Sequence, residues 1–313
     1  MSDWKILVSD GLSAGGLAIL KAAAQVDDKP TITADELLAT AAEYDAFVVR
    51  GRTKVTPAVF EAATKLKVVG RAGVGVDNID LTTARAKGVT VVNAPKSTSL
   101  AVAELAIGMM FAVARRLPFA DATMKQGLWE KKKLEGIELA GKTLGIIGMG
   151  NIGSAVAKRT AALGMQVLGY DPLVPADEIT RRGAEPVTLE TLYARADFIT
   201  IHIPLTPESK NMLSGQAFAQ MKRGVRLIDA ARGGVVDETA LLGALESGQV
   251  AAAALDVFAT EPPGLTALVA HPNVIATPHI GAQTEEAQTR AGDDIASEVI
   301  AALRGEPLRW KIV

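Results

Sequence analysis

The stretch TLGIIGMGNIG, residues 143–153, joins an apolar run to three glycines spaced as G-x-G-x-x-G. The apolar part is typical of a buried strand, and the helical pattern SAVAKRTAALG follows directly. Between a strand and a helix, Gly148 allows a tight turn, Gly150 lets a pyrophosphate approach the backbone, and Gly153 lets the two elements pack closely. The stretch therefore predicts a dinucleotide-binding unit.

The elements after this turn refine the choice of dinucleotide. The helix that begins at Asn151 and Ile152 would direct its first N–H groups at the phosphates. The next strand, QVLGYD, places Asp171 at its end, eighteen residues after Gly153. A carboxylate there accepts hydrogen bonds from both ribose hydroxyls of NAD and repels the 2′-phosphate of NADP. We expect NAD as the cofactor.

Short apolar runs alternate with helical patterns along most of the chain, which indicates parallel sheets with helices on both faces. A long helix from about Ser99 to Arg116 separates two such series. We predict an α/β protein of two doubly wound parallel-sheet domains. A Rossmann-type cofactor domain, 100–282, would be inserted in a flavodoxin-like substrate domain made of 1–99 and 283–313.

Composition excludes several classes of function. The 33 basic and 35 acidic side chains nearly balance, so neither a nucleic-acid nor a membrane partner is indicated. With no cysteine, the chain has no disulfide, iron–sulfur cluster or thiolate metal site, and we expect no metal. The most apolar run, LAIGMMFAVA, is too short to span a bilayer, and the first residues are no signal peptide. A cytoplasmic location is expected.

Three segments after late strands carry unusual polar residues. DAARGGVVDE contains Arg232, ALDVFATEPP contains Asp256 and Glu261, and TPHIGA contains His279. In open parallel sheets, ligands bind where strands end. Together with RAGVGVDNID and GKTLGIIGMGNIG, these segments resemble the D-isomer-specific 2-hydroxyacid dehydrogenase family over nearly the whole chain.

The resemblance implies a catalytic triad of Arg232, Glu261 and His279. Oxidation of a 2-hydroxy acid removes a hydride from C2 and a proton from its hydroxyl, and histidine suits the proton transfer. Glu261, expected to be buried, would bind the other ring nitrogen of His279 and fix its tautomer. Arg232 would grip the carboxylate with its forked guanidinium, and Asp256 would hold the nicotinamide amide.

The same resemblance extends the cofactor site beyond the glycine-rich turn. The further cofactor contacts that it implies come from Val74, Ile203, Ala230, Ala231, Arg232, Asp256, His279 and Gly281. The other two histidines are not expected to be catalytic. We expect His271 to be an exposed loop residue and His202 to line the cofactor crevice. The family commonly has asparagine where this chain has Asp229, which leaves the fine cofactor contacts open.

Cations near the end of an N-terminal strand suggest the substrate. The segment VVRGRTKVT carries Arg50, Arg52 and Lys54, of which only Arg50 is implied to bind substrate; the other two are equally well solvated charges. The segment that starts at Arg71 adds backbone N–H groups where a carboxylate could sit, and the predicted substrate contacts there are Arg71, Gly73, Val74 and Gly75. With Arg232 and His279, this set suits a 2-hydroxy acid that carries both a carboxylate and a phosphate. The resemblance implies that this substrate is 3-phosphoglycerate, oxidised to 3-phosphohydroxypyruvate toward serine.

Two other functions stay open at this point. One is a glyoxylate or hydroxypyruvate reductase, or another D-2-hydroxyacid dehydrogenase; the other is an NAD-sensing, corepressor-like binding protein. The resemblance also implies a homodimer or dimer of dimers through the long helix after Ser99, with Lys131 a candidate cation for the neighbouring site. We expect closure of the two domains around substrate, no C-terminal regulatory domain, and no inhibition by serine.

Overall fold

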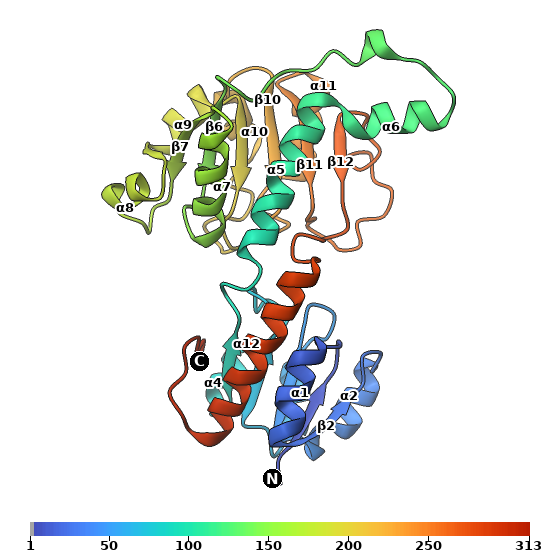
Figure 1. Ribbon diagram of the computed structural model, residues 1–313, viewed down its shortest axis with the longest axis vertical. Helices are drawn as coiled ribbons and strands as arrows, with labels where there is room; N and C mark the ends of the chain where they lie inside the picture. The colour runs from blue at the N-terminus through green and yellow to red at the C-terminus, as the bar shows by residue number, and fades with distance from the viewer. Residues whose placement is uncertain (1–2) are drawn as a thin grey trace. The chain divides into compact units, whose positions relative to one another are not determined.

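The computed structural model describes residues 3–313, and its chain forms two compact units (Figure 1). Unit 1 comprises Met1–Ser99 and Ala282–Val313, and unit 2 comprises Leu100–Gly281. Each unit has its own parallel sheet and its own hydrophobic core, and each is described below by itself.

Unit 1 is built on a five-stranded parallel sheet in the order β2-β1-β3-β4-β5. This is the flavodoxin-like order, in which the chain reverses direction across the sheet between β1 and β3. Its strands are β1 (Lys5–Val8), β2 (Gln25–Asp28), β3 (Ala46–Val49), β4 (Val68–Arg71) and β5 (Thr90–Asn93). β3 is buried at all four positions, as expected of a strand covered on both faces.

Helices cover both faces of this sheet. α1 and α12 pack with residues such as Ile6 and Val68 on one face, whereas α2, α3 and α4 pack with Leu7 and Phe47 on the other. α12 lies so close to β4 that a side chain at Gly70 would collide with Val299. The helices are α1 (Ala14–Ala23), α2 (Ala34–Thr40), α3 (Pro57–Ala62), α4 (Leu81–Ala86) and α12 (Glu285–Arg304), with a 3-10 turn η1 (Ala41–Glu43).

Unit 2 is built on a seven-stranded parallel sheet in the order β12-β11-β10-β9-β6-β7-β8. Its first strand, β6, lies between β7 and β9, which is the doubly wound order of dinucleotide-binding sheets. The predicted fold class is confirmed for both sheets. The strands are β6 (Thr143–Ile147), β7 (Gln166–Tyr170), β8 (Glu185–Pro186), β9 (Phe198–Ile201), β10 (Val225–Asp229), β11 (Val250–Leu255) and β12 (Val274–Ala276).

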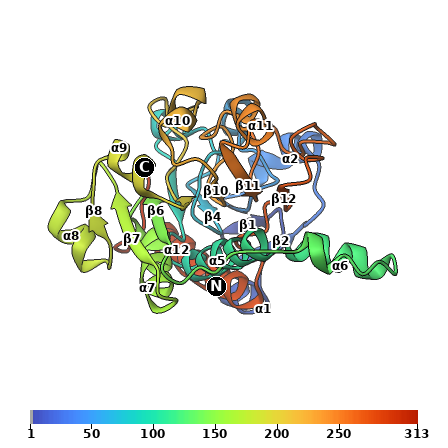
Figure 2. The same cartoon turned by 90° about the horizontal axis from the view of Figure 1, so that it is seen from above.

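The helices of unit 2 form two layers, which Figure 2 shows on opposite sides of the sheet. α5 and α7 pack on one face, and α9, α10 and α11 pack on the other. After α5 the chain makes an excursion through α6 and the 3-10 turn η2. The helices are α5 (Ser99–Arg115), α6 (Leu117–Lys125), α7 (Asn151–Ala162), α8 (Ala176–Arg181), α9 (Leu189–Arg195), α10 (Gly215–Gln220) and α11 (Glu238–Glu246), and η2 is Lys131–Lys133.

Two strands, β2 and β8, do not show the apolar pattern that predicts a strand, and the long helix α5 ends one residue before its predicted end. β2 has the sequence QVDD and lies at the edge of its sheet with polar side chains, and β8 has two residues, one of them proline. Neither carries the apolar run by which the other strands were found. α5 ends at Arg115 because Arg116 adopts a left-handed conformation, with φ of 52°, before α6 begins.

Candidate functional site

The candidate catalytic and cofactor residues of unit 2 follow the carboxyl ends of neighbouring strands. Gly148 comes directly after β6, Asp171 after β7 and His202 after β9. Arg232 follows β10, and Asp256 follows β11. Because all strands of this sheet are parallel, these groups gather along one edge of it.

Each of the three glycines in the turn after β6 serves a different purpose. Gly148 has φ of 96°, and a Cβ there would lie 2.5 Å from the carbonyl oxygen of His202. A Cβ at Gly153 would collide with the carbonyl oxygen of Gly148, so the start of α7 packs directly on the turn. A Cβ at Gly150 would meet nothing within 4 Å. The open space at the second glycine is therefore available to a ligand, as the cofactor requires.

The surroundings of this turn suit a pyrophosphate and a ribose. α7 begins after Gly150 with no side chain capping its first N–H groups, so these remain available to phosphate oxygens. Asp171 lies beside the turn: its Oδ2 accepts from the Met149 N–H at 2.8 Å, and its Oδ1 accepts from the Leu173 N–H at 2.9 Å. The carboxylate is thus fixed where the adenosine ribose is expected.

One cation at this turn was not found from the sequence. Nη1 of Arg182 donates a hydrogen bond to the carbonyl oxygen of Met149, and its Nε donates to Glu178 at 2.7 Å. Arg182 follows α8, 29 residues after Gly153, the last glycine of the turn. No local motif marks it, because only the fold brings it to the turn.

His202 and Ile203 follow β9 and pack beneath the glycine-rich turn. A Cβ at Gly148 would lie 2.7 Å from Cγ2 of Ile203. The Nε2 of His202 lies 3.0 Å from the Thr200 hydroxyl, and its Nδ1 is inaccessible to water without a hydrogen-bond partner. Burial lowers the pKa of His202 to about 3, although part of the residue is exposed. His202 is therefore a neutral packing group at the cofactor edge.

The structure brings His279 and Glu261 together. Nδ1 of His279 lies 2.8 Å from Oε2 of Glu261, so the Nδ1–H donates to the carboxylate. Oε1 of the same carboxylate accepts from the Phe258 N–H at 3.1 Å. The side chain of Glu261 is 38% exposed and that of His279 is 47% exposed, so the expectation of a buried glutamate was wrong. The bond leaves Nε2 of His279 for a substrate.

Asp256 holds the loop that carries His279. Its side chain is fully buried, and Oδ1 accepts from the Thr277 hydroxyl at 2.6 Å and the Ile280 N–H at 2.8 Å. Oδ2 accepts from the Gly281 N–H at 2.8 Å. Between these anchors His279 has φ of 53°, a left-handed conformation that is uncommon for residues other than glycine. The expected contact of Asp256 with nicotinamide would have to use its remaining acceptor capacity.

Arg232 lies in a tightly packed turn after β10. Ala230 and Ala231 are buried, and Nη1 of Arg232 donates to the carbonyl oxygen of Ala231 at 2.7 Å. A Cβ at Gly233 would collide with the carbonyl oxygen of Phe258. Glycine therefore lets the segment after Arg232 pack against the segment that leads to Glu261.

Arg50, in unit 1, is a half-buried cation at the end of β3. Burial lowers the pKa of its guanidinium, although arginine stays charged at any physiological pH. Its backbone is held by Asp10, which accepts from the Arg50 N–H at 2.7 Å, and by Asn78, which donates to the Arg50 carbonyl oxygen at 2.8 Å. Within residues 3–313, the structure records no hydrogen bond or ion pair of this guanidinium. Sequence reasoning missed both supports of its backbone.

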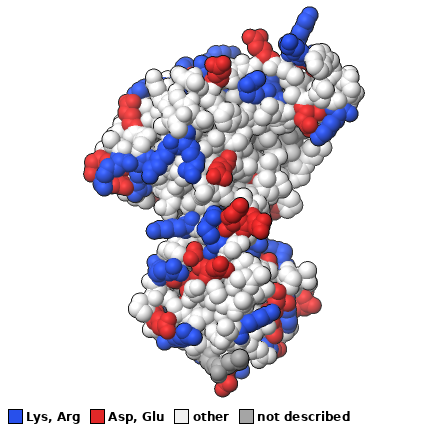
Figure 3. Space-filling model, viewed as in Figure 1, with Lys and Arg blue, Asp and Glu red and all other residues white. Residues whose placement is uncertain are grey.

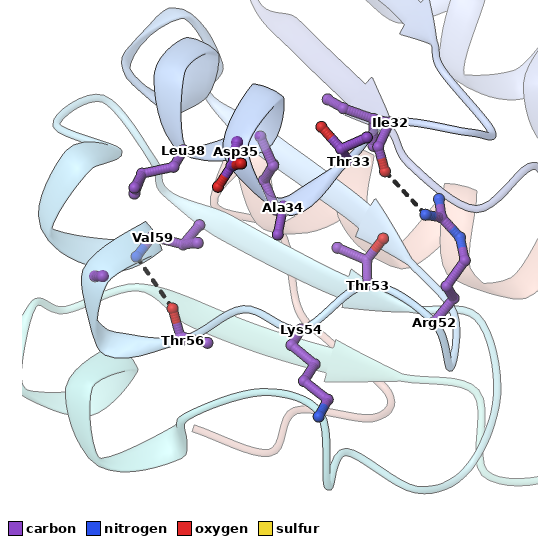
Figure 4. Close-up of a pocket in the computed structure, with 12 residues that line it drawn as sticks. Ile32, Thr33, Ala34, Asp35, Leu38, Arg52, Thr53, Lys54, Thr56 and Val59 are labelled. Carbon is purple, nitrogen blue, oxygen red and sulfur yellow. Dashed lines mark hydrogen bonds between the residues drawn. The ribbon is translucent and has the colours of Figure 1, made fainter. Parts of the chain in front are cut away.

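Arg52 and Lys54 differ from Arg50. The Arg52 guanidinium points toward Ile32 (Figure 4) and donates to the carbonyl oxygens of Ile32 at 2.8 Å and Ser9 at 2.6 Å. It also pairs with Asp10 at 2.9 Å. These bonds join separate loops of unit 1, so Arg52 is a structural cation. Lys54 is exposed beside it, and both residues border a pocket of about 330 Å³ between α2 and α3.

The turn after Arg71 is arranged differently from the expectation. The Gly73 N–H donates to the Arg71 carbonyl oxygen at 2.8 Å, so it is not available to a carboxylate, and that part of the prediction was wrong. Gly73 has φ of 150° and packs against the Arg71 guanidinium. The N–H groups of Val74 and Gly75 have no recorded acceptor within the described part of the chain. The Asn93 side chain donates to the Val74 carbonyl oxygen at 2.7 Å and fixes this turn.

The remaining sequence expectations concern metals, membranes and the excursion. Across residues 3–313, no group of histidine, aspartate and glutamate side chains could hold a metal ion, and no helix could cross a membrane. On the face shown in Figure 3, basic and acidic side chains are interspersed with neutral areas. Lys131 is exposed in η2, and His271 is a half-buried loop residue whose Nδ1 accepts from the Asn273 N–H.

A family model and curated relatives both relate this chain to the 2-hydroxyacid dehydrogenases. Residues 107–281 match the family model described as D-isomer specific 2-hydroxyacid dehydrogenase, NAD binding domain. The D-3-phosphoglycerate dehydrogenases of Rattus norvegicus and Methanocaldococcus jannaschii are each 49% identical to this chain, over 97% and 96% of it. The chain spans 57% and 58% of the lengths of these two relatives.

A solved structure extends the likeness to the whole fold. A glyoxylate reductase from Paecilomyes thermophila superposes with a TM-score of 0.90 at 28% identity, covering 100% of this chain and 99% of that one. The sequence prediction of NAD as the cofactor is confirmed by the family model, and unit 2 contains its NAD-binding domain.

Substitution of Gly150 separates cofactor binding from folding. We expect Gly150→Ala to weaken NADH binding at least about tenfold, because the new methyl group enters the open space at the turn. Its melting temperature without cofactor should match the wild type, whereas Gly153→Ala should lower it because that Cβ collides with backbone. NADH fluorescence titration and thermal melting measure the two effects. Unchanged NADH affinity in Gly150→Ala would place the pyrophosphate elsewhere.

Proposed function

Because this chain belongs to the D-isomer-specific 2-hydroxyacid dehydrogenase family, we propose that it oxidises 3-phosphoglycerate to 3-phosphohydroxypyruvate with NAD. The observation that carries the chemistry is the 2.8 Å bond between Nδ1 of His279 and Glu261. The names of the relatives from rat and Methanocaldococcus jannaschii support the substrate, as does the half-buried Arg50 guanidinium.

In the proposed reaction, His279 is the base. Its Nε2 takes the proton of the C2 hydroxyl as the C2–O bond becomes a carbonyl. Glu261 accepts the Nδ1–H throughout, which fixes the tautomer and stabilises the imidazolium that forms. Bound NAD supplies the acceptor for the hydride that leaves C2. In the reverse direction the same imidazolium returns the proton to the carbonyl oxygen.

The other proposed contacts hold the substrate. Arg232 binds the carboxylate of the 2-hydroxy acid through its forked guanidinium, which also favours negative charge developing on the C2 oxygen. Arg50 binds the phosphate, for which a half-buried arginine is well suited because less water competes for its donors. The N–H groups of Val74 and Gly75 are proposed as further donors to an anionic group.

We also propose that the protein acts in the cytoplasm as a homodimer. The absence of cysteine fits a reducing compartment. Large apolar side chains are exposed along α5, α6 and the excursion, where a second copy could cover them. They are Phe111, Leu117, Met124, Leu128 and Trp129.

The dimer is tested by mass in solution. Light scattering on a sizing column should give twice the chain mass, and Trp129→Glu with Met124→Glu should give the single mass, because charges would then occupy the apolar surface. A wild-type protein that runs at the single mass at all concentrations would contradict the proposal.

Removal of the base should stop chemistry and spare binding. We expect His279→Gln to lower kcat by about 10²- to 10⁴-fold, with NADH affinity changed less than about threefold. Glu261→Gln should give an intermediate loss, since the amide keeps the size but not the charge that stabilises the imidazolium. The measurement is NADH formation with 3-phosphoglycerate and a trap for the product.

His271→Gln is the matched control, because it removes an imidazole elsewhere in unit 2. It should leave kcat within about twofold of the wild type. If His279→Gln retains the wild-type rate, the proposed proton transfer is wrong. If the wild type binds NAD but turns over no 2-hydroxy acid, the chain is instead an NAD-sensing binding protein.

The substrate is tested at Arg50. The wild type should prefer 3-phosphoglycerate to D-glycerate in kcat/KM, and Arg50→Ala should lose about tenfold to a hundredfold with 3-phosphoglycerate only. Lys67→Ala removes an exposed cation of the same unit and should change neither value. If the wild type shows no preference for the phosphate, the activity is that of a glyoxylate or hydroxypyruvate reductase or of another 2-hydroxyacid dehydrogenase.

A further inference from the structure

Asp229 places a carboxyl group inside the sheet edge at which the candidate site lies. It is the last residue of β10, and its neighbours in the sheet are Ile201 of β9 and Leu255 of β11. The residue is 2% exposed. Ionising a carboxyl group that is buried between two neighbouring strand ends costs free energy. The presence of an aspartate at this position therefore needs a structural or functional reason.

The hydrogen bonds of Asp229 connect it to both sides of the site. Its Oδ1 accepts from the Ala231 N–H at 2.9 Å, and the Arg232 N–H also bonds to this carboxyl group. Its own carbonyl oxygen accepts from the Asp256 N–H at 2.8 Å. The side chain therefore shapes the turn that carries Arg232, while the main chain ties this turn to the residue that anchors the His279 loop.

Two N–H donors discriminate between a carboxylate and an amide at this position. A carboxylate offers two acceptor oxygens, whereas asparagine offers one oxygen and an NH₂ group that cannot accept. An asparagine at Asp229 must therefore weaken one of the two bonds or serve both with one oxygen. In its ionised form aspartate fits this turn better as a hydrogen-bond acceptor, but its charge can be gained or lost.

The charged groups that act on Asp229 come from its own loop and from the neighbouring strand. Burial, the largest cause, raises its pKa to about 7, and the charge of Asp256 after β11 acts in the same direction. The backbone bonds and the charge of Arg232 lower it. His202, which follows β9, stays neutral near pH 7 because its pKa is lowered to about 3. Asp229 thus exchanges its proton near neutrality.

We propose that Asp229 is a positioning residue for Arg232 whose proton couples to the binding of a carboxylate ligand. With Asp229 ionised, its negative charge offsets the field of the Arg232 guanidinium. With Asp229 protonated, that offset is gone, and Arg232 attracts an anion more strongly. Binding of a 2-hydroxy or 2-oxo acid therefore takes up a proton at Asp229. This coupling to ligand binding rests on the proposed role of Arg232. The exchange of a proton at Asp229 in the unliganded protein does not depend on that role.

The first arm of the test measures stability without any ligand. Above its ordinary pKa of 3.8 an aspartate is ionised in the unfolded chain, whereas folded Asp229 keeps its proton up to about pH 7. The folded state then binds more protons between these values, so stability falls as pH rises through that window and levels off above it. Asp229→Asn lacks this loss, so its melting temperature should rise relative to the wild type from about pH 5 to about pH 8.

The second arm measures proton uptake on binding oxamate, a 2-oxo acid analogue, to the protein with NADH. Calorimetry in buffers of different ionisation enthalpy should show that the wild type takes up more protons near pH 7 than Asp229→Asn, by up to about half a proton. Both proteins keep His279, so its own exchange cancels from the difference. The wild-type Kd should rise about threefold or more, relative to Asp229→Asn, from about pH 6 to about pH 8.

Asp121→Asn removes an exposed carboxylate of unit 2 and should behave as the wild type in both arms. If Asp229→Asn does not fold, Asp229→Ser replaces it in both arms. Whichever variant is used, a wild type that takes up no proton on binding oxamate overturns the proposal. A melting difference that is flat with pH also overturns it. If the melting difference follows pH but wild-type oxamate binding fails at every pH, the role of Arg232 in the proposed function is wrong and the coupling falls with it.

Discussion

The candidate site depends on the buried carboxylate of Asp256. Its two oxygens accept three hydrogen bonds from residues on both sides of His279, which hold this residue in a left-handed conformation. A backbone in that region costs free energy on the order of 1 kcal/mol or more, so it persists only where surrounding contacts fix it. The imidazole then reaches Glu261 through Nδ1, and its Nε2 is left for the proposed proton transfer.

Three acidic side chains serve the same edge in different electrostatic settings. Asp256 is buried and surrounded by donors from one loop, Glu261 is partly exposed and bonded to an imidazole, and Asp229 is buried where its charged form is disfavoured. The same functional group therefore acts as an anchor, as a partner of a ring and as a proton-exchanging group. Burial and the number of hydrogen-bond donors decide which of these roles a carboxyl group takes. Neither quantity can be predicted from the residue type alone.

The sequence predicted the parts of the fold that rest on local patterns. The strand–glycine–helix unit at Gly148, the doubly wound class and the partnership of His279 with Glu261 all came from spacing or resemblance, and the structure brings these groups together. Contacts set by tertiary packing were missed. Arg182 reaches the glycine-rich turn, and Arg52 is held by carbonyl oxygens of other loops. No neighbouring residue encodes such contacts.

Unit 1 is assembled from two distant parts of the chain, because α12 covers the face of its sheet formed by residues such as Ile6, Val48 and Val68. During synthesis, the ribosome releases all of unit 2 before α12 emerges. Until then α1 alone can cover this face of the sheet, so the nascent chain carries a partly uncovered apolar face while the second unit already has every residue that it needs to fold. The unit translated first is thus completed last, and chaperones that shield apolar surface have their longest opportunity at its strands.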